Sequence, residues 1–279
     1  GFKHDQVLPT FAKKAVAFID DHQAGAATKN KPMFLYFPLA APHTPWMPTG
    51  KFVGSSKAGM YGDFVSQVDD AIGQVLGALD KHKLTDDTLV FFTSDNGPVW
   101  YAEDVKKYGH SSVGQLRGMM GDAWEGGHHM PFVAKWPGKI KPGSSSDEVI
   151  CFTDMLATFA AIVGDKLPDG AGEDSYNILP AMLGEKYNKP IREATVTTAG
   201  LMAIRQGRWK LILGLGSGGF SKPRKVKPKK GEPKGQLYDM KSDPGETTNV
   251  YADHPDIVDR LTKLLAKYRT DGRSTPLVR

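Results

Sequence analysis

Asp95 and Asn96 are the side chains whose type and position point most directly to chemistry. They follow the short apolar run Leu89–Phe92 and stand in the turn-prone segment Ser94–Pro98. Such a run predicts a strand buried on both faces. Ligands of open α/β sheets bind at the carboxyl ends of strands, and carboxylate and amide oxygens suit Ca²⁺ or Mg²⁺. The alternative is that the segment is only a turn.

His43 is predicted to stand at the end of a second buried strand, Met33–Leu39. That strand runs into Ala41–Pro48, whose three prolines exclude regular structure. His43 is therefore expected on a rigid loop in the same kind of position as Asp95. Two strands with polar tips in one α/β pattern favour a shared site. The alternative for His43 is an exposed side chain without a role.

The long irregular stretch Val99–Met130 carries further candidates. Loops of this length in compact domains are usually functional or disordered, and the aromatic content argues against disorder. Its polar candidates are His110, Arg117, Glu125, His128 and His129. Two adjacent histidines beside a glutamate raise the possibility of a transition-metal site, but the spacing HExxH that such sites use on helices is missing.

Length and composition limit the classes of protein to consider. A chain of 279 residues fits one large domain, or a domain with a smaller appendage, and no apolar run approaches a membrane span. The single cysteine, Cys151, excludes an internal disulfide framework and a cysteine-rich zinc site, and its apolar setting predicts an inert thiol. The first residues carry neither an initiator Met nor a signal-peptide pattern, so we expect the chain to start within a longer protein.

The positive charge is concentrated in one segment. The formal charge is +5, whereas Lys222–Lys234 alone holds seven Lys or Arg residues and one Glu, a net charge of +6. A solvated surface loop is one interpretation. The other is attraction of a polyanion, either a sulfated polysaccharide or a nucleic acid. The segment has no aromatic residue for base stacking, which makes nucleic acid the weaker partner.

The order of elements predicts an α/β fold with a mostly parallel central sheet sandwiched by helices. Helices are expected over Val7–His22 and Tyr61–His82, and a strand over Pro131–Trp136 followed by a helix that ends near Val163. From Arg192 onward, short strands and one helix over 255–268 predict a small C-terminal antiparallel sheet with a packed helix. We therefore expect an α/β domain over residues 1–190, incomplete at its N-terminal side, and a C-terminal subdomain over 191–279.

A series of short motifs runs along the whole chain in a fixed order. They are Pro32–Phe37 with Ala41–Pro45, Gln67–Asp70, Phe92–Gly97, Leu116–Gly118 with Trp124–Gly127, Trp136–Gly138, Thr153–Thr158, Ala203–Ile212, and Leu237–Met240 with Asp243–Glu246. In this order and spacing, the chain resembles the formylglycine-dependent, arylsulfatase-like sulfatases of the alkaline phosphatase superfamily.

The resemblance implies a set of roles. Asp95 and Asn96 would be two ligands of an active-site Ca²⁺, and His43 would hydrogen-bond the sulfate or the leaving-group oxygen. His110 and His129 would face the substrate. The implied substrate is a sulfated carbohydrate or an aryl sulfate, and the implied location is the periplasm or outside the cell. No nucleic acid partner and no membrane span are expected.

The chain also departs from the family pattern. The nucleophile motif, Cys/Ser-x-Pro-x-Arg, is absent, and Cys151 does not stand in it. The remaining aspartates of the calcium site are expected upstream of this chain. The chain therefore looks like the C-terminal portion of a sulfatase that lacks the formylglycine, and we expect it to be inactive alone.

Two substitutions bear on the sulfate site itself. Met120 stands where the family usually has Lys, and His129 where it has Arg. A thioether neither donates a hydrogen bond nor neutralises a sulfate oxygen. The first hypothesis is a sulfuric ester hydrolase. The alternatives are a non-catalytic relative that binds sulfate or glycan, and a phosphoryl-transfer member of the same superfamily.

Overall fold

The structure is a computed structural model that describes residues 1–277. The chain separates into two compact units, and each is described by itself. Unit 1 comprises Gly1–Leu89 with Asp104–His110, and unit 2 comprises Val90–Glu103 with Ser111–Arg279. The domain boundary expected near residue 190 stays a prediction.

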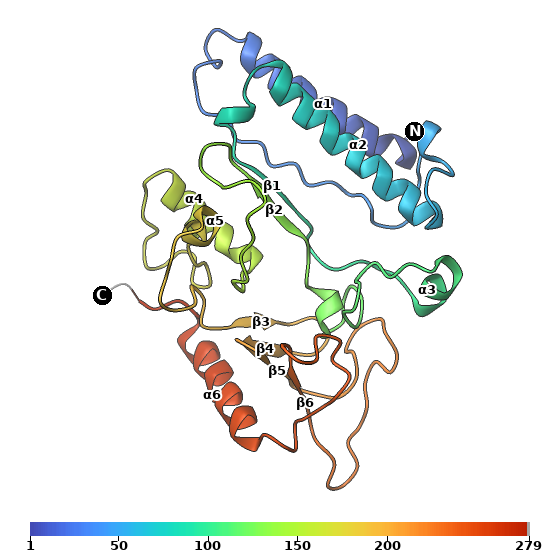
Figure 1. The fold of residues 1–279 in the computed structure, drawn as a ribbon, viewed down its shortest axis with the longest axis vertical. Coiled ribbons are helices and arrows are strands. Elements are labelled where there is room, and N and C mark those ends of the chain that lie inside the picture. Colours follow the sequence, from blue (N-terminus) through green and yellow to red (C-terminus); the bar gives the residue numbers. More distant parts are fainter. Residues whose placement is uncertain (278–279) are drawn as a thin grey trace. The chain divides into compact units, whose positions relative to one another are not determined.

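Unit 1 is built on two long helices that lie side by side, α1 (Val7–Ala24) and α2 (Gly59–Lys81) (Figure 1). Both were predicted from their apolar periodicity. Their contact buries Leu8 and Ala12 of α1 against Phe64 and Ala71 of α2. The shorter helices of residues 1–110 are η1 (His4–Gln6), η2 (Gly50–Phe52), η3 (Thr85–Asp87) and α3 (Ala102–Tyr108).

The strand predicted over Met33–Leu39 does not form as a regular strand. The segment is irregular, and Phe34 and Tyr36 are 71% and 69% exposed. The exposed positions alternate with half-buried ones, so the period of two in the sequence is present. A strand also needs a paired neighbouring strand, and residues 33–39 belong to neither of the two sheets in the described chain.

The first part of unit 2 contains the strand that ends at Asp95. β1 (Val90–Thr93) pairs antiparallel with β2 (Phe132–Lys135), with Phe91 opposite Ala134. Both strands were predicted, but a parallel central sheet is not confirmed, because this pair is antiparallel. The Phe91 ring lies 5.8 Å from that of Phe159 in α4 (Met155–Ile162), so a helix packs on β1. The remaining elements are η4 (Glu125–Gly127), η5 (Phe152–Asp154) and α5 (Leu179–Leu183).

The C-terminal antiparallel sheet with a packed helix is confirmed (Figure 1). Its strands follow in sequence order: β3 (Thr195–Thr197), β4 (Ala203–Gln206), β5 (Trp209–Ile212) and β6 (Gln236–Asp239). The helix is α6 (Pro255–Asp271). Side chains alternate between the two faces of a strand. One face therefore buries Ile204, Leu211 and Leu237 under α6.

The opposite face of this sheet packs against the loop that follows the strand tip. Ala203, Ile212 and Tyr238 form a second buried cluster with Ala123 and Trp124 of that loop. The alternation that points Leu211 toward α6 places Lys210 and Ile212 on this loop-facing side. The sheet thus supports the stretch of chain in which the sequence places its candidates.

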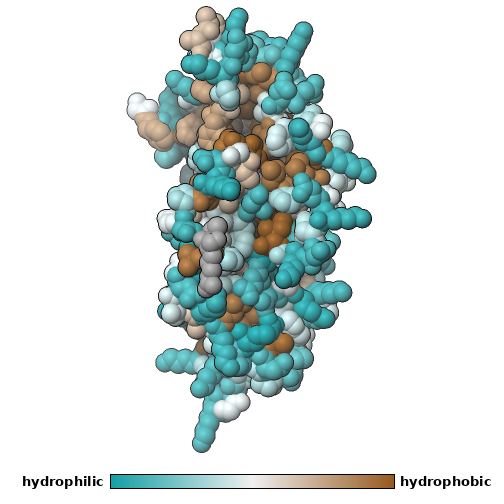
Figure 2. Space-filling model, turned by 90° about the vertical axis from the view of Figure 1, so that its left-hand side faces the viewer, coloured by the Kyte–Doolittle hydropathy of each residue, from teal (hydrophilic) through white to brown (hydrophobic). Residues whose placement is uncertain are grey.

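The surface is mixed in character. Figure 2 shows hydrophilic side chains over most of the face it presents, with hydrophobic ones exposed among them. Large apolar side chains that remain exposed in unit 2 include Val133, Leu156 and Val163. Within residues 1–277, no helix combines the length and the apolar character that crossing a bilayer requires.

Candidate functional site

Asp95 and Asn96 lie in a bend directly after β1. The backbone N–H of Asn96 donates to Asp95 Oδ1 at 3.0 Å, and the Ser94 hydroxyl donates to the Asn96 carbonyl at 3.0 Å. The Asn96 side-chain amide donates to the Gly97 carbonyl at 2.9 Å, so its nitrogen is occupied and its oxygen is left for a ligand. The segment can therefore be both a turn and a pair of metal ligands, because the bend places the side-chain oxygens of Asp95 and Asn96 at the strand tip.

The strand tip is joined tightly to the loop 117–129. The Gly97 N–H donates to the Gly127 carbonyl at 2.9 Å, and the Met120 N–H donates to the Pro98 carbonyl at 2.9 Å. A Cβ on Gly97 would lie 1.9 Å from the Gly126 carbonyl oxygen. Only glycine permits so close a backbone approach. Met120 is consequently held beside the segment that carries Asp95 and Asn96.

The loop 117–129 is in turn fixed to the C-terminal sheet. Arg117 stacks over the Trp124 ring at 3.6 Å and donates to the Glu246 carbonyl at 2.7 Å. The Trp124 indole N–H donates to Gln236 Oε1 at 3.1 Å, and the Tyr238 hydroxyl donates to the same oxygen at 2.8 Å. These contacts satisfy the polar atoms that the buried cluster encloses.

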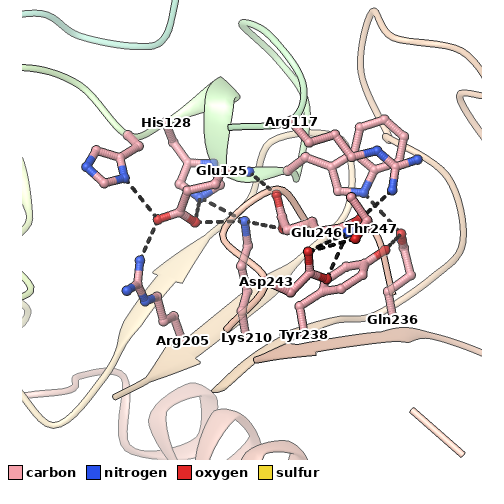
Figure 3. Close-up of polar contacts among 12 residues, drawn as sticks. Arg117, Glu125, His128, Arg205, Lys210, Gln236, Tyr238, Asp243, Glu246 and Thr247 are labelled. Carbon is pink, nitrogen blue, oxygen red and sulfur yellow. Dashed lines mark hydrogen bonds and ion pairs between the residues drawn. The ribbon is translucent and has the colours of Figure 1, made fainter. Parts of the chain in front are cut away.

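Lys210 is the buried cation at the centre of this arrangement (Figure 3). Its side chain is 1% exposed, with Nζ 3.0 Å from Glu125 Oε2 and 2.9 Å from Glu246 Oε1. Glu125 also pairs with Arg205 at 2.5 Å, and its backbone N–H donates to Glu246 Oε2 at 2.6 Å. One lysine of the sheet therefore joins a carboxylate of the loop to a carboxylate of the turn that follows β6.

The two carboxylates differ in how well they are compensated. Burial alone would raise the pKa of Glu125, but hydrogen bonds from His128 and His129 and the Lys210 and Arg205 cations hold the pKa well below its usual range. Burial raises the pKa of Glu246, and the Lys210 cation only partly opposes it. The ion pair to Glu246 Oε1 lacks hydrogen-bond geometry, so this oxygen has no hydrogen-bond partner among residues 1–277.

His128 and His129 both contact Glu125 but differ in exposure. His129 Nδ1 lies 3.3 Å from Glu125 Oε1 while the side chain is 56% exposed, which leaves it open to a substrate. His128 Nε2 lies 3.4 Å from Glu125 Oε2, and its buried Nδ1 has no hydrogen-bond partner in the described part of the chain. Glu125 thus contacts both histidines and helps to position the exposed ring of His129.

His43 and His110 belong to unit 1. His43 is exposed, and its Nδ1 lies 2.6 Å from the Thr44 carbonyl oxygen. A carbonyl accepts, so Nδ1 carries the proton and Nε2 is left for a ligand. His110 is also exposed and ends the segment Asp104–His110. In unit 2, backbone hydrogen bonds join the segment that carries Asp95 and Asn96 to the loop 117–129, while these two histidines are described with unit 1.

The described residues do not form a complete metal centre. Across residues 1–277, no group of three or more His, Cys, Asp or Glu side chains is arranged to hold a metal ion. The hypothetical transition-metal site at His128–His129 therefore finds no support. Asp95 and Asn96 are hard oxygen donors that suit Ca²⁺ in chemistry, whereas Ca²⁺ takes six to eight oxygen ligands.

Sequence reasoning missed Lys210, Arg205 and Glu246 as parts of the site. One signal was available: Lys210 interrupts an apolar strand at a position that alternation assigns to the interior. A lysine is almost never fully buried unless it is paired, so this position called for carboxylate partners. The sequence gives no means of choosing Glu125 and Glu246 as those partners.

A comparison with known protein families identifies the family to which this chain belongs. The profile of the family described as Sulfatase matches residues 5–164, which is more than half of the chain. The chain belongs to the sulfatase family. The resemblance recognised in the sequence motifs is thereby confirmed.

Individual sulfatases align along much of the chain. The chain is 33% identical over 274 residues to an N-acetylgalactosamine-6-O-sulfatase of Bacteroides thetaiotaomicron, covering 96% of this chain and 52% of that protein. It is 35% identical over 201 residues to the N-acetylgalactosamine-6-sulfatase of Sus scrofa, covering 72% of this chain and 37% of that protein. The chain thus spans about half the length, or less, of these curated relatives.

Solved structures agree with the assignment. A Bacteroides thetaiotaomicron protein solved in work on the metabolism of multiple glycosaminoglycans superposes with a TM-score of 0.83 at 33% identity, covering 96% of this chain and 55% of that chain. A protein solved in complex with k-i-k-neocarrahexaose superposes with a TM-score of 0.73 at 26% identity, covering 94% and 54% of the two chains. The sulfatase fold is therefore present over nearly the whole chain.

We predict that Lys210→Met destabilises the protein by about 3–5 kcal/mol, because it leaves two buried carboxylates without their shared cation. Chemical denaturation measures the free energy of unfolding. Lys263→Met is the matched control, since Lys263 pairs with Asp259 on the exposed surface of α6 and such pairs contribute little.

The loss in Lys210→Met should be smaller at pH 5 than at pH 8. A carboxyl group whose pKa is higher in the folded than in the unfolded state binds its proton more tightly in the folded state. The free energy of unfolding therefore rises as the pH falls. Glu246 is such a group, and its protonation removes the buried charge that Lys210→Met leaves without a cation, whereas Glu125 keeps its pair with Arg205. Equal losses for the two lysine variants, or a loss independent of pH, would contradict the assigned role of Lys210.

Proposed function

We propose that this chain supplies the calcium-binding strand tip and part of the substrate-binding surface of a sulfuric ester hydrolase that acts on sulfated carbohydrate. The observation that carries the proposal is the identity of 33% over 96% of the chain to an N-acetylgalactosamine-6-O-sulfatase. The bend at Asp95 and Asn96, held against the loop with Met120 and His129, supports it. A periplasmic or extracellular location is part of the same proposal.

In the proposed site Asp95 and Asn96 hold the ion through side-chain oxygens. A bound Ca²⁺ would supply a positive charge that stabilises developing negative charge on the sulfate oxygens. Gly97 and Met120 keep the two ligands in place through their backbone hydrogen bonds to Gly127 and Pro98. The fixed backbone means that the ligands do not have to be ordered when the substrate arrives.

The proposed histidines act on the substrate. His43, with Nδ1 held at the Thr44 carbonyl, would donate from Nε2 to the bridging oxygen when protonated, and so neutralise the charge that forms as the S–O bond breaks. His129 would contribute a hydrogen-bond donor toward the sulfate, with its ring positioned by Glu125. His110 would contact the substrate as well.

The nucleophile is the group that this chain does not encode. No Cys/Ser-x-Pro-x-Arg motif occurs in its 279 residues, and Cys151, which is half-buried, stands before Phe152 in a different context. Hydrolysis through a covalent sulfate intermediate needs such a group. The proposal is therefore that this chain binds sulfate esters without turning them over, and that turnover requires the complete protein.

We predict that this chain alone releases no 4-nitrophenol from 4-nitrophenyl sulfate beyond the rate of a boiled sample. The absorbance of 4-nitrophenolate measures the reaction. Release above the boiled control, in the presence of Ca²⁺, would contradict the proposal that the nucleophile lies outside this chain.

In the complete protein, Met120→Lys should raise the rate of sulfate ester hydrolysis by about 10²–10³, the usual effect of one charged donor at a developing oxyanion. Met119→Lys is not a suitable control because Met119 is buried, so Met60→Lys, at an exposed position of α2, serves instead. An unchanged rate in Met120→Lys would show that position 120 does not contact the sulfate.

A non-catalytic sulfate- or glycan-binding relative is the second candidate. Met120 favours it, because a thioether in the sulfate site weakens catalysis more than binding of the rest of a glycan. If the complete protein lacks turnover in both the native and the Met120→Lys forms but still binds sulfated glycan, this second candidate replaces the first. A phosphoryl-transfer activity finds no specific support in the described residues.

A further inference from the structure

The connection between β5 and β6 carries the basic segment Lys222–Lys234, which we call the basic loop. In Figure 1 this connection runs out from the sheet as a long excursion and returns at β6. It holds seven Lys or Arg side chains against one Glu, and all seven are exposed. The seven are Lys222, Arg224, Lys225, Lys227, Lys229, Lys230 and Lys234.

No carboxylate pairs with the basic side chains of the basic loop within the described chain, although Arg224 lies over the Phe220 ring at 5.7 Å. Elsewhere in unit 2, Arg192, Arg205 and Lys210 each pair with a carboxylate. Among residues 1–277, no ion pair involves any of the seven basic side chains of the loop. The carboxylate of Glu232 instead accepts the backbone N–H of Lys229 at 2.8 Å. A concentrated, unpaired positive charge of this kind attracts polyanions.

The start of the basic loop is ordered by backbone hydrogen bonds. Ser217 and Gly218 donate to the carbonyls of Pro223 and Arg224 at 2.9 Å and 2.8 Å, and Val226 donates to Leu215 at 3.0 Å. Three prolines within the loop further restrict its backbone. A surface that is ordered before binding loses less conformational entropy when a ligand arrives.

The segment that leads into the basic loop, residues 217–221, packs directly on the loop that carries Met120. Ala123 donates its N–H to the Ser217 carbonyl at 2.7 Å, and the Ser221 N–H donates to Asp122 Oδ1 at 3.0 Å. A Cβ on Gly219 would lie 2.0 Å from the Gly121 carbonyl oxygen, so the two backbones touch. Residues 217–221, which lead into the basic loop, therefore pack on residues 121–123, which immediately follow Met120.

We propose that the basic loop binds the sulfated chain of a polymeric substrate and thereby selects sulfated polysaccharide over small sulfate esters. This inference rests on the proposed function, since it extends the sulfate-binding region of the same site. The repeated negative charges of a sulfated glycan complement the seven exposed Lys and Arg side chains of the basic loop. Proteins that bind single-stranded nucleic acid combine such charge with aromatic stacking platforms, and the basic loop contains no aromatic residue.

The test compares two charge-reversed variants with equal net charge. Lys229→Glu/Lys230→Glu lowers the charge of the basic loop from +6 to +2. Lys13→Glu/Lys14→Glu makes the same change on the exposed side of α1. Binding of heparin is measured by affinity chromatography and by titration at several salt concentrations, with N- and O-desulfated heparin and a single-stranded DNA as further probes.

We expect the loop variant to bind heparin at least about tenfold more weakly and with a shallower dependence on salt, since fewer counterions are released. The α1 variant should bind as the native chain does, and desulfated heparin should bind neither. An equal loss of heparin affinity in both variants would show that only the net charge of the protein matters, and this would overturn the proposal. Unchanged binding in the loop variant would overturn it too, as would DNA binding as tight as heparin and equally sensitive to the loop variant.

Failure of this inference and failure of the proposed function are separable. Heparin binding is measured without turnover, so its loss or retention in the loop variant reports only on the basic loop. Hydrolysis of 4-nitrophenyl sulfate by the complete protein reports only on the catalytic proposal, because that substrate has no polymeric chain.

Discussion

The burial of one lysine between two carboxylates is the interaction on which the candidate site depends. Lys210 is almost fully removed from water, and it is tolerated only because Glu125 and Glu246 both lie within ion-pair distance. Glu125 belongs to the loop after the strand tip, Lys210 to the sheet, and Glu246 to the turn beyond β6. A charge that has to be paired thus holds three segments, far apart in sequence, in one arrangement.

That arrangement extends outward to every residue of unit 2 that the proposed chemistry uses. Glu125 contacts His129. The backbone of Gly126, which follows Glu125, lies so close to Gly97 that a Cβ at position 97 would collide with it. In the same loop Met120 bonds to Pro98, and Asp122 and Ala123 bond to residues 217–221, which lead into the basic loop. Ion pairs at the sheet and close backbone contacts at the strand tip therefore position the strand tip, the loop 117–129 and the start of the basic loop relative to one another.

The sequence predicted the elements whose pattern is local. The helices α1 and α2 and the strands β4 to β6 follow apolar periodicity, so their existence needed no knowledge of partners. Met33–Leu39 shows the limit: its alternation is present, but a strand also needs a neighbour, and its expected burial is not observed. The same limit applies to the parallel sheet, since β1 pairs antiparallel with β2. Asp95 and Asn96 could be proposed because a strand tip is a local feature, whereas Lys210 was missed because its partners come from distant segments.

Hydrogen exchange of the amides at the strand tip tests most directly whether Lys210 holds the candidate site together. The amides of Gly97, Met120 and Gly126 are bonded within the tip and its loop, whereas the amide of Leu237 donates to the Asn249 side chain and reports on the outer edge of the sheet. The account predicts that Lys210→Met, compared with Lys263→Met, accelerates exchange at the three tip amides more than at Leu237. Unchanged protection at the tip, with the sheet equally or more affected, would contradict it.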